Sequence, residues 1–181
     1  MRLPSGIILG LALLAGAGAA AAEITARNLR CVQYPGFPGA HSTWGSIGYS
    51  AAFDRVYAGV TNHRDTVALY EYDCAAEDIR LLGFLPDMAH LRGWQWQGKI
   101  HSQIVEGPDS AMYFSSDGGE TRMLYLMNHP AGYSGGYYYR WDIPAGRLDR
   151  LTMGMRYDSV KDMIVGGPGG KILGATFPRV H

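Results

Sequence analysis

The side chains best suited to chemistry are three histidines and one aspartate that lie far apart in the chain. They are His63, His101, Asp117 and His181. Imidazole nitrogens and carboxylate oxygens bind divalent metal ions and also act as general bases and acids. His101 is the best candidate for a catalytic residue, and His63 and Asp117 would join it in a metal site. No pair of histidines has the spacing of a H-x-H or H-E-x-x-H motif, so ordinary structural roles remain an alternative.

Aromatic and acidic residues give two further candidates. Trp94 and Trp96, together with Trp44, could form an aromatic platform that binds a sugar ring, or they could fill the space between sheets. Glu106 and Asp109 are neighbouring carboxylates of the kind that perform acid–base catalysis, but they flank Gly107-Pro108, where capping of a turn explains them equally well.

The first 22 residues have the pattern of a secretory signal peptide. Arg2 is followed by an apolar run over residues 6–14 and then by Ala and Gly up to Ala22, which predicts cleavage before Glu23. A membrane anchor is the alternative, although the strongly apolar part is short for a bilayer. We therefore expect a secreted or periplasmic protein, with residues 23–43 as a lead-in segment and no attachment to the membrane after cleavage.

The charge balance excludes several kinds of partner. The chain has 16 basic and 16 acidic residues, and removal of Arg2 with the signal peptide leaves 15 against 16, a net charge of −1. Such a chain lacks the basic surface that binds nucleic acid or anionic lipid. An apolar content of 47% and an aromatic content of 12% fit a globular domain and not a disordered chain.

The two cysteines, Cys31 and Cys74, both follow the predicted cleavage point. An even number of cysteines in an oxidising compartment favours a disulfide, which would fasten the lead-in segment to the first repeat. Two free thiols are the alternative.

The elements that must position these residues are short strands that recur along the chain. No helical periodicity is present, whereas short alternating segments, glycine and tyrosine are abundant, so we expect an all-β fold. Two copies of a four-strand pattern and half of a third occupy residues 44–92, 98–155 and 160–181. The predicted strands are 46–51, 55–60, 68–72 and 79–84, then 101–106, 111–115, 137–141 and 148–153, then 162–165 and 171–176.

This repeat is typical of β-propellers, in which each copy forms a four-stranded antiparallel blade. We predict two complete blades and a partial third, an incomplete propeller. The first strand of each blade lines the axis of such a fold, so His101, His63 and Asp117 are expected to converge on one face. An insertion around residues 120–136 lengthens one loop of the second copy, and insertions in repeats often lie on the binding face.

The number of blades is smaller than a closed ring needs, since propellers close with four or more. The chain could be an N-terminal fragment of a longer propeller. Alternatively, several chains could associate through their open blade edges, or the sheets could form a small curled structure.

Two segments resemble blades of exported bacterial propellers. Residues 98–109 followed by Met112-Tyr113-Phe114, and residues 135–142 with their Gly-Gly pair and terminal Tyr-x-x-Asp, are loosely similar to the gluconolactonase-like and streptogramin-lyase-like families. The resemblance covers about residues 98–177 and implies that a ligand and any divalent metal would lie at the axis, held by residues from several blades.

Two functions follow as expectations. The first is an exported binding or interaction module whose ligand is a small molecule or carbohydrate. The alternative is a lactonase- or lyase-type enzyme that uses an axial histidine or metal site on a carbohydrate-derived or cyclic ester substrate.

Overall fold

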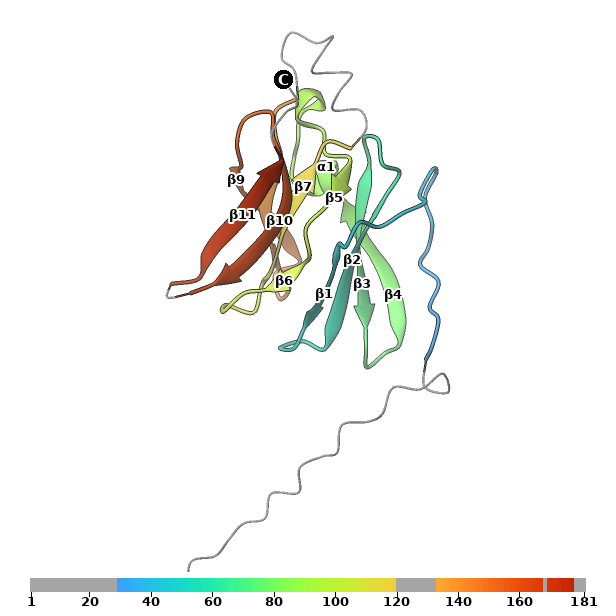
Figure 1. The fold of residues 1–181 in the computed structure, drawn as a ribbon. Helices are drawn as coiled ribbons and strands as arrows, with labels where there is room; N and C mark the ends of the chain where they lie inside the picture. Colours follow the sequence, from blue (N-terminus) through green and yellow to red (C-terminus); the bar gives the residue numbers. More distant parts are fainter. Residues whose placement is uncertain (1–28, 120–132, 168, 178–181) are drawn as a thin grey trace, which may run out of the picture. The chain divides into compact units, whose positions relative to one another are not determined.

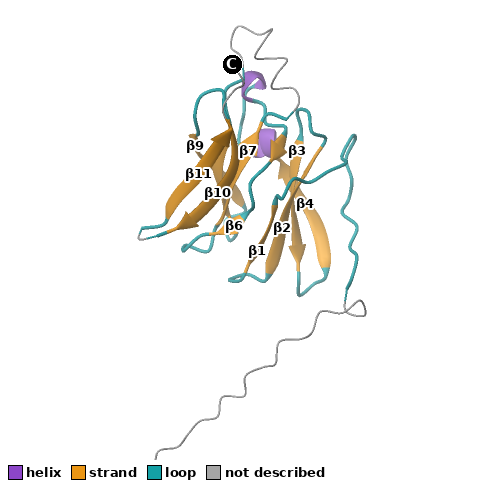
Figure 2. Cartoon of the chain, in the orientation of Figure 1, coloured by secondary structure: helices purple, strands orange, loops and turns teal. Residues whose placement is uncertain are grey.

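The computed structural model describes residues 29–119, 133–167 and 169–177. The sheets all belong to the compact unit that spans residues 32–181. The predicted signal peptide, His129 and His181 lie outside the described residues, as does most of the loop insertion. Within the described part the protein is all-β, with antiparallel sheets that do not close on themselves (Figures 1 and 2).

The first sheet is a meander of four strands in chain order. They are β1 (Ile47–Ser50), β2 (Arg55–Thr61), β3 (Val67–Asp73) and β4 (Asp78–Phe84). All four predicted strands are confirmed. Polar residues stabilise the turns between these strands: Asp54 and Glu77 adopt positive φ angles, and Asp73 Oδ1 accepts the backbone N–H groups of Ala75 and Ala76 at 3.0 Å.

The second sheet repeats the meander, but its first strand is broken. It consists of β5 (Lys99–Ile100), β6 (Val105–Glu106), β7 (Met112–Asp117), β8 (Tyr137–Asp142) and β9 (Arg147–Met153), with β5 and β6 both paired to β7. The prediction of one continuous strand over 101–106 is therefore wrong. Ser102 Oγ replaces a backbone acceptor for the N–H of Ser115, and the N–H of Ile104 donates to Ile47 on the neighbouring sheet.

The third sheet is a hairpin of β10 (Ser159–Gly166) and β11 (Lys171–Phe177). A β-bulge interrupts the pairing between Val160 and Asp162, so Lys161 is the extra residue of β10. Both strands were predicted, whereas the bulge was not.

Two short helices connect the first and second sheets. They are α1 (Leu85–Met88), which has Pro86 in its first turn, and the 3-10 helix η1 (Gly93–Gln95). No helix in the described ranges has the length and apolar composition needed to cross a bilayer.

The sheets pack face to face because glycines allow their backbones to approach closely. A Cβ on Gly48 would lie 1.7 Å from the carbonyl oxygen of Ile104, and one on Gly136 would lie 2.8 Å from the backbone nitrogen of Val160. The interior between the first two sheets is apolar and aromatic. It includes Tyr57, Leu69, Leu85, Ile100, Met112, Phe114, Tyr139 and Trp141.

The predicted disulfide is not formed, because Cys31 and Cys74 are both free. Cys31 is exposed. Cys74 is half-buried in the turn after β3, where its backbone N–H donates to Asp54. Burial raises the pKa of the Cys74 thiol, and the carboxylates of Asp54 and Asp73 raise it further.

Candidate functional site

The structure brings His63, His101 and Asp117 together with three residues that complete a polar group where the three sheets meet. We call this group the Asp117 cluster. Its members are Trp44, His63, Lys99, His101, Asp117 and Lys161. They come from the segment before β1, the β2–β3 loop, β5, the break after β5, the end of β7 and the bulge of β10. The predicted convergence of the two histidines and the aspartate is therefore present.

The centre of the cluster is a buried carboxylate that faces two ammonium groups. Lys99 and Asp117 are direct cross-strand partners on β5 and β7, with Nζ and Oδ2 3.9 Å apart. Lys161 Nζ donates to the same Oδ2 from β10, so one carboxylate links the second and third sheets. The other oxygen, Oδ1, accepts the N–H of Gly119 at 2.8 Å. Both Asp117 and Lys99 are buried.

Burial alone would raise the pKa of Asp117, because a charged carboxylate is costly in a medium of low polarity. The hydrogen bond and charge of Lys161, the charge of Lys99 and the N–H of Gly119 outweigh that cost, and the pKa lies below its ordinary value. Asp117 is therefore ionised at neutral pH.

The β-bulge of β10 positions both the side chain and the carbonyl group of Lys161. As the extra residue of the bulge, Lys161 is not constrained by pairing to β11, and its side chain turns to Asp117. Its carbonyl oxygen, which the ladder does not use, accepts a hydrogen bond from His101 Nδ1 at 2.9 Å.

His101 is held in a defined neutral form. Because a carbonyl oxygen only accepts, Nδ1 must carry the proton, which leaves Nε2 as an unprotonated acceptor. Burial lowers the pKa of His101, and the nearby charges of Lys161 and Lys99 lower it further, against a smaller opposing effect of the hydrogen bond and of Asp117. The ring is thus neutral at neutral pH, as a general base requires.

His63 is fixed by the loop that carries it. The side-chain oxygen of Asn62 accepts the N–H groups of Arg64, Asp65 and Thr66, and His63 takes a positive φ of 60° within that turn. His63 Nε2 lies 3.0 Å from Lys99 Nζ. Since an ammonium only donates, this nitrogen of His63 is the acceptor.

Trp44 closes the cluster on its exposed side. Its ring centroid is 4.7 Å from that of His63 and 6.4 Å from that of His101, and the latter pair is stacked. Lys99 Nζ lies 4.5 Å from the Trp44 ring centroid, a cation–π contact. The Trp44 side chain remains 42% exposed, so part of the ring can contact a ligand.

The metal site predicted from His63, His101 and Asp117 is not supported. Among residues 29–119, 133–167 and 169–177, no group of three or more His, Cys, Asp or Glu side chains is placed to hold a metal ion. Two ammonium groups already neutralise Asp117, and their positive charge opposes a cation at this position. The donor set thus does not fit a divalent metal.

The other predicted site residues are not members of the Asp117 cluster. Trp96 is buried, its ring is tilted against that of Tyr133 with centroids 5.2 Å apart, and its Nε1–H donates to Gly118, so the ring belongs to the interior. Trp94 is exposed in η1. Glu106 accepts hydrogen bonds from Ser50 Oγ and the N–H groups of Ala51 and Ala52, which ties the β1–β2 turn to the second sheet. Asp109 pairs with Arg140 at 2.9 Å.

The sequence interpretation missed Lys99 and Lys161. A signal for Lys99 existed, because alternation on a strand places Lys99 on the side opposite Ile100, which is a core residue. No comparable signal marked Lys161, whose position depends on the bulge.

One motif was also overlooked. Residues 132–136 spell Gly-Tyr-Ser-Gly-Gly, which matches the Gly-x-Ser-x-Gly pattern of hydrolase nucleophiles. That motif needs a strand–turn–helix setting, whereas Ser134 leads into strand β8. Its Oγ donates to Gly135 at 3.4 Å, so Ser134 has a structural role here.

A search of protein families, of curated proteins and of solved structures finds no match to this chain. The arguments for a function therefore depend on the cluster itself.

Proposed function

We propose that this chain is an exported binding module of propeller type, and that it holds a small carbohydrate-derived ligand bearing a carboxylate at the Asp117 cluster. The propeller architecture is supported by the meander order β1-β2-β3-β4 and by its repetition in the second sheet. β6, part of the broken first strand of the second sheet, contacts β1 on one side and β10 on the other, so the first strands of successive sheets lie side by side, as in adjacent blades.

The observation that carries the proposal is a pair of ammonium groups beside an exposed aromatic ring. Among the described residues of the cluster, Lys99 and Lys161 carry positive charge and Asp117 carries negative charge. A ligand carboxylate would bind to the ammonium groups, and the neutral Nε2 of His101 would accept a ligand hydroxyl. The open part of the Trp44 ring suits the apolar face of a sugar.

A test compares galacturonate with galactose, which share most of their hydroxyls but differ in the carboxylate. Calorimetry and the imidazole NMR signals of His63 and His101 report binding. We expect galacturonate to bind more tightly, Lys161→Met to weaken it about tenfold, and Lys171→Met on exposed β11 to leave it unchanged. Equal binding of the two sugars, or equal effects of the two lysine substitutions, would refute the proposed ligand class.

A second candidate, a lactonase-type enzyme, is favoured by His101. Its Nε2 could take a proton from a water molecule that attacks the carbonyl carbon of a cyclic ester, and the imidazolium could return that proton to the departing ring oxygen. The test asks whether the protein hydrolyses δ-gluconolactone faster than buffer alone does. The release of acid measures the rate. Activity that His101→Gln abolishes would favour the enzyme, and activity equal to buffer would remove it.

A further inference from the structure

The two outermost faces of the sheet stack are both open and apolar. On the third sheet, Ile164 and Leu173 are cross-strand partners and each is 62% exposed. On the first sheet, Ile47 is 60% exposed and Tyr49 is 52% exposed. Large apolar side chains in adjacent positions on a sheet face mark a surface that other protein covers.

The direction of each face follows from strand alternation. A Cβ on Gly174 would lie 1.9 Å from the Tyr138 hydroxyl, so this side of the hairpin packs on the second sheet and Leu173 points away from it. Gly48 likewise packs on Ile104, so Ile47 and Tyr49 point away from the second sheet. The two open faces are thus opposite ends of one stack.

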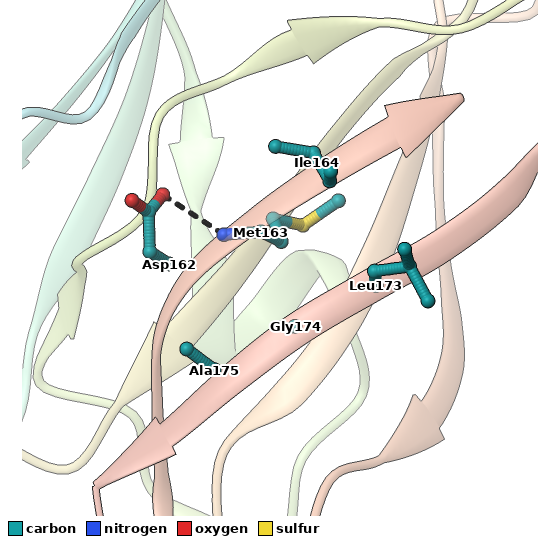
Figure 3. Close-up of a pocket in the computed structure, with 6 residues that line it drawn as sticks. All are labelled: Asp162, Met163, Ile164, Leu173, Gly174 and Ala175. Carbon is teal, nitrogen blue, oxygen red and sulfur yellow. Dashed lines mark hydrogen bonds between the residues drawn. The ribbon is translucent and has the colours of Figure 1, made fainter. Parts of the chain in front are cut away.

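The hairpin face is hollowed as well as apolar. A shallow pocket of about 280 Å³ lies over β10 and β11, and Figure 3 shows its lining. The lining residues are Asp162, Met163, Ile164, Leu173, Gly174 and Ala175. Asp162 is the one charged residue of this lining, and its carboxylate accepts the N–H of Met163 at 2.8 Å. The other residues of the lining are apolar residues and a glycine.

The open face of the first sheet lies at its β1 edge. Tyr34 and Phe37 of the lead-in segment cover the β3–β4 half, with ring centroids 5.4 Å from Tyr70 and 5.3 Å from Phe84. Val60 at the end of β2 lies in the same covered cluster, whereas Ile47 and Tyr49 of β1 remain exposed. The uncovered surface therefore lies over β1 and the start of β2, and we call it the β1–β2 face.

We infer that copies of this chain associate head to tail, the hairpin face of one copy packing on the β1–β2 face of the next. This contact would repeat the face-to-face packing that already joins the first sheet to the second and the second to the third. The interface is heterologous, because different surfaces of the two copies meet, so it would generate a ring or a filament. The inference does not depend on the proposed ligand.

The test measures the mass of the full chain in solution by sedimentation and light scattering across a range of concentrations. We expect wild-type protein to associate, and both Leu173→Lys and Ile47→Lys to prevent it, because each charge blocks one half of the contact. Leu151→Lys, at an exposed apolar position of β9, is the matched control and should associate like wild type. Circular dichroism checks that every variant is folded.

Mixing the two blocked variants gives the sharpest result. Leu173→Lys keeps an intact β1–β2 face and Ile47→Lys keeps an intact hairpin face, so an equimolar mixture should form dimers and nothing larger. All variants keep residues 1–22, so association through that segment would be the same in each. A monomeric wild type, a mixture that stays monomeric, or association that survives Ile47→Lys would overturn the inference, the last by showing that the hairpin pairs with itself.

Discussion

Asp117 at the end of β7 and Lys161 in the bulge of β10 form an ion pair across 44 positions of sequence, and this pair joins the second sheet to the third. It gathers the other charged groups around it, since Lys99 faces the same carboxylate and His101 binds the carbonyl group of Lys161. The cluster therefore has a structural consequence that can be measured separately from any ligand.

We expect Asp117→Asn to lower the free energy of unfolding by about 3–5 kcal/mol, because Lys99 would be left as a buried charge without its carboxylate. Urea denaturation measures the loss. The matched control is Asp109→Asn, which breaks a more exposed pair with Arg140 and should cost less than about 1 kcal/mol. Equal losses in the two variants would contradict a buried, coupled Asp117.

Asp117 should also make the free energy of unfolding fall at acidic pH. Its pKa is lower in the folded protein than in the unfolded chain, so the unfolded state binds more protons as pH falls. Its stabilising contribution should be complete above the ordinary aspartate pKa of about 3.9 and should be lost as pH falls toward the lower folded value. Unfolding measured at a series of acidic pH values should show this slope in wild type and a smaller one in Asp117→Asn.

His101 should affect the free energy of unfolding in a higher pH range than Asp117 does. Burial lowers its pKa when folded, so below the ordinary histidine pKa of about 6.5 the unfolded state again takes up more protons and stability falls. NMR titration should place the His101 transition below that value, and His101→Gln should flatten the stability profile below about pH 6.5. A transition at or above 6.5 would contradict the burial of a neutral ring.

The sequence was sufficient to predict the sheets because each of their strands is local and regular. The alternation around Tyr57 recurs around Tyr113, and the aspartate that ends the third strand recurs as Asp73 and Asp142, so the strand positions could be predicted to within a few residues. The break in the first strand of the second sheet escaped prediction, because it depends on Ser102 and on a contact between Ile104 and the neighbouring sheet.

The site was predicted in part for the same reason. His63, His101 and Asp117 lie at corresponding ends of repeated strands, and topology alone brings them together. Lys161 reaches Asp117 only through a bulge, and a one-residue change of register leaves no mark in the sequence pattern. The metal was proposed at this carboxylate because the two ammonium groups that face it were not foreseen.

Gly48 should be essential for the packing of the first two sheets. Gly48→Ala would place a methyl group 1.7 Å from the backbone oxygen of Ile104, and backbone atoms cannot move aside as a side chain does. We expect a loss of about 3 kcal/mol or more in the free energy of unfolding. Gly93→Ala, which meets nothing within 4 Å, is the control and should change stability by less than about 1 kcal/mol.

The two cysteines should differ in reactivity. The thiolate is the reacting species, and burial with the neighbouring Asp54 raises the pKa of Cys74, whereas Cys31 is exposed. A disulfide reagent at neutral pH should therefore modify one thiol quickly and the other slowly. Cys74→Ser should remove the slow phase, and Asp54→Asn should accelerate it by removing a negative charge. A single fast phase for both thiols in the folded wild type would show that Cys74 is not shielded in this way.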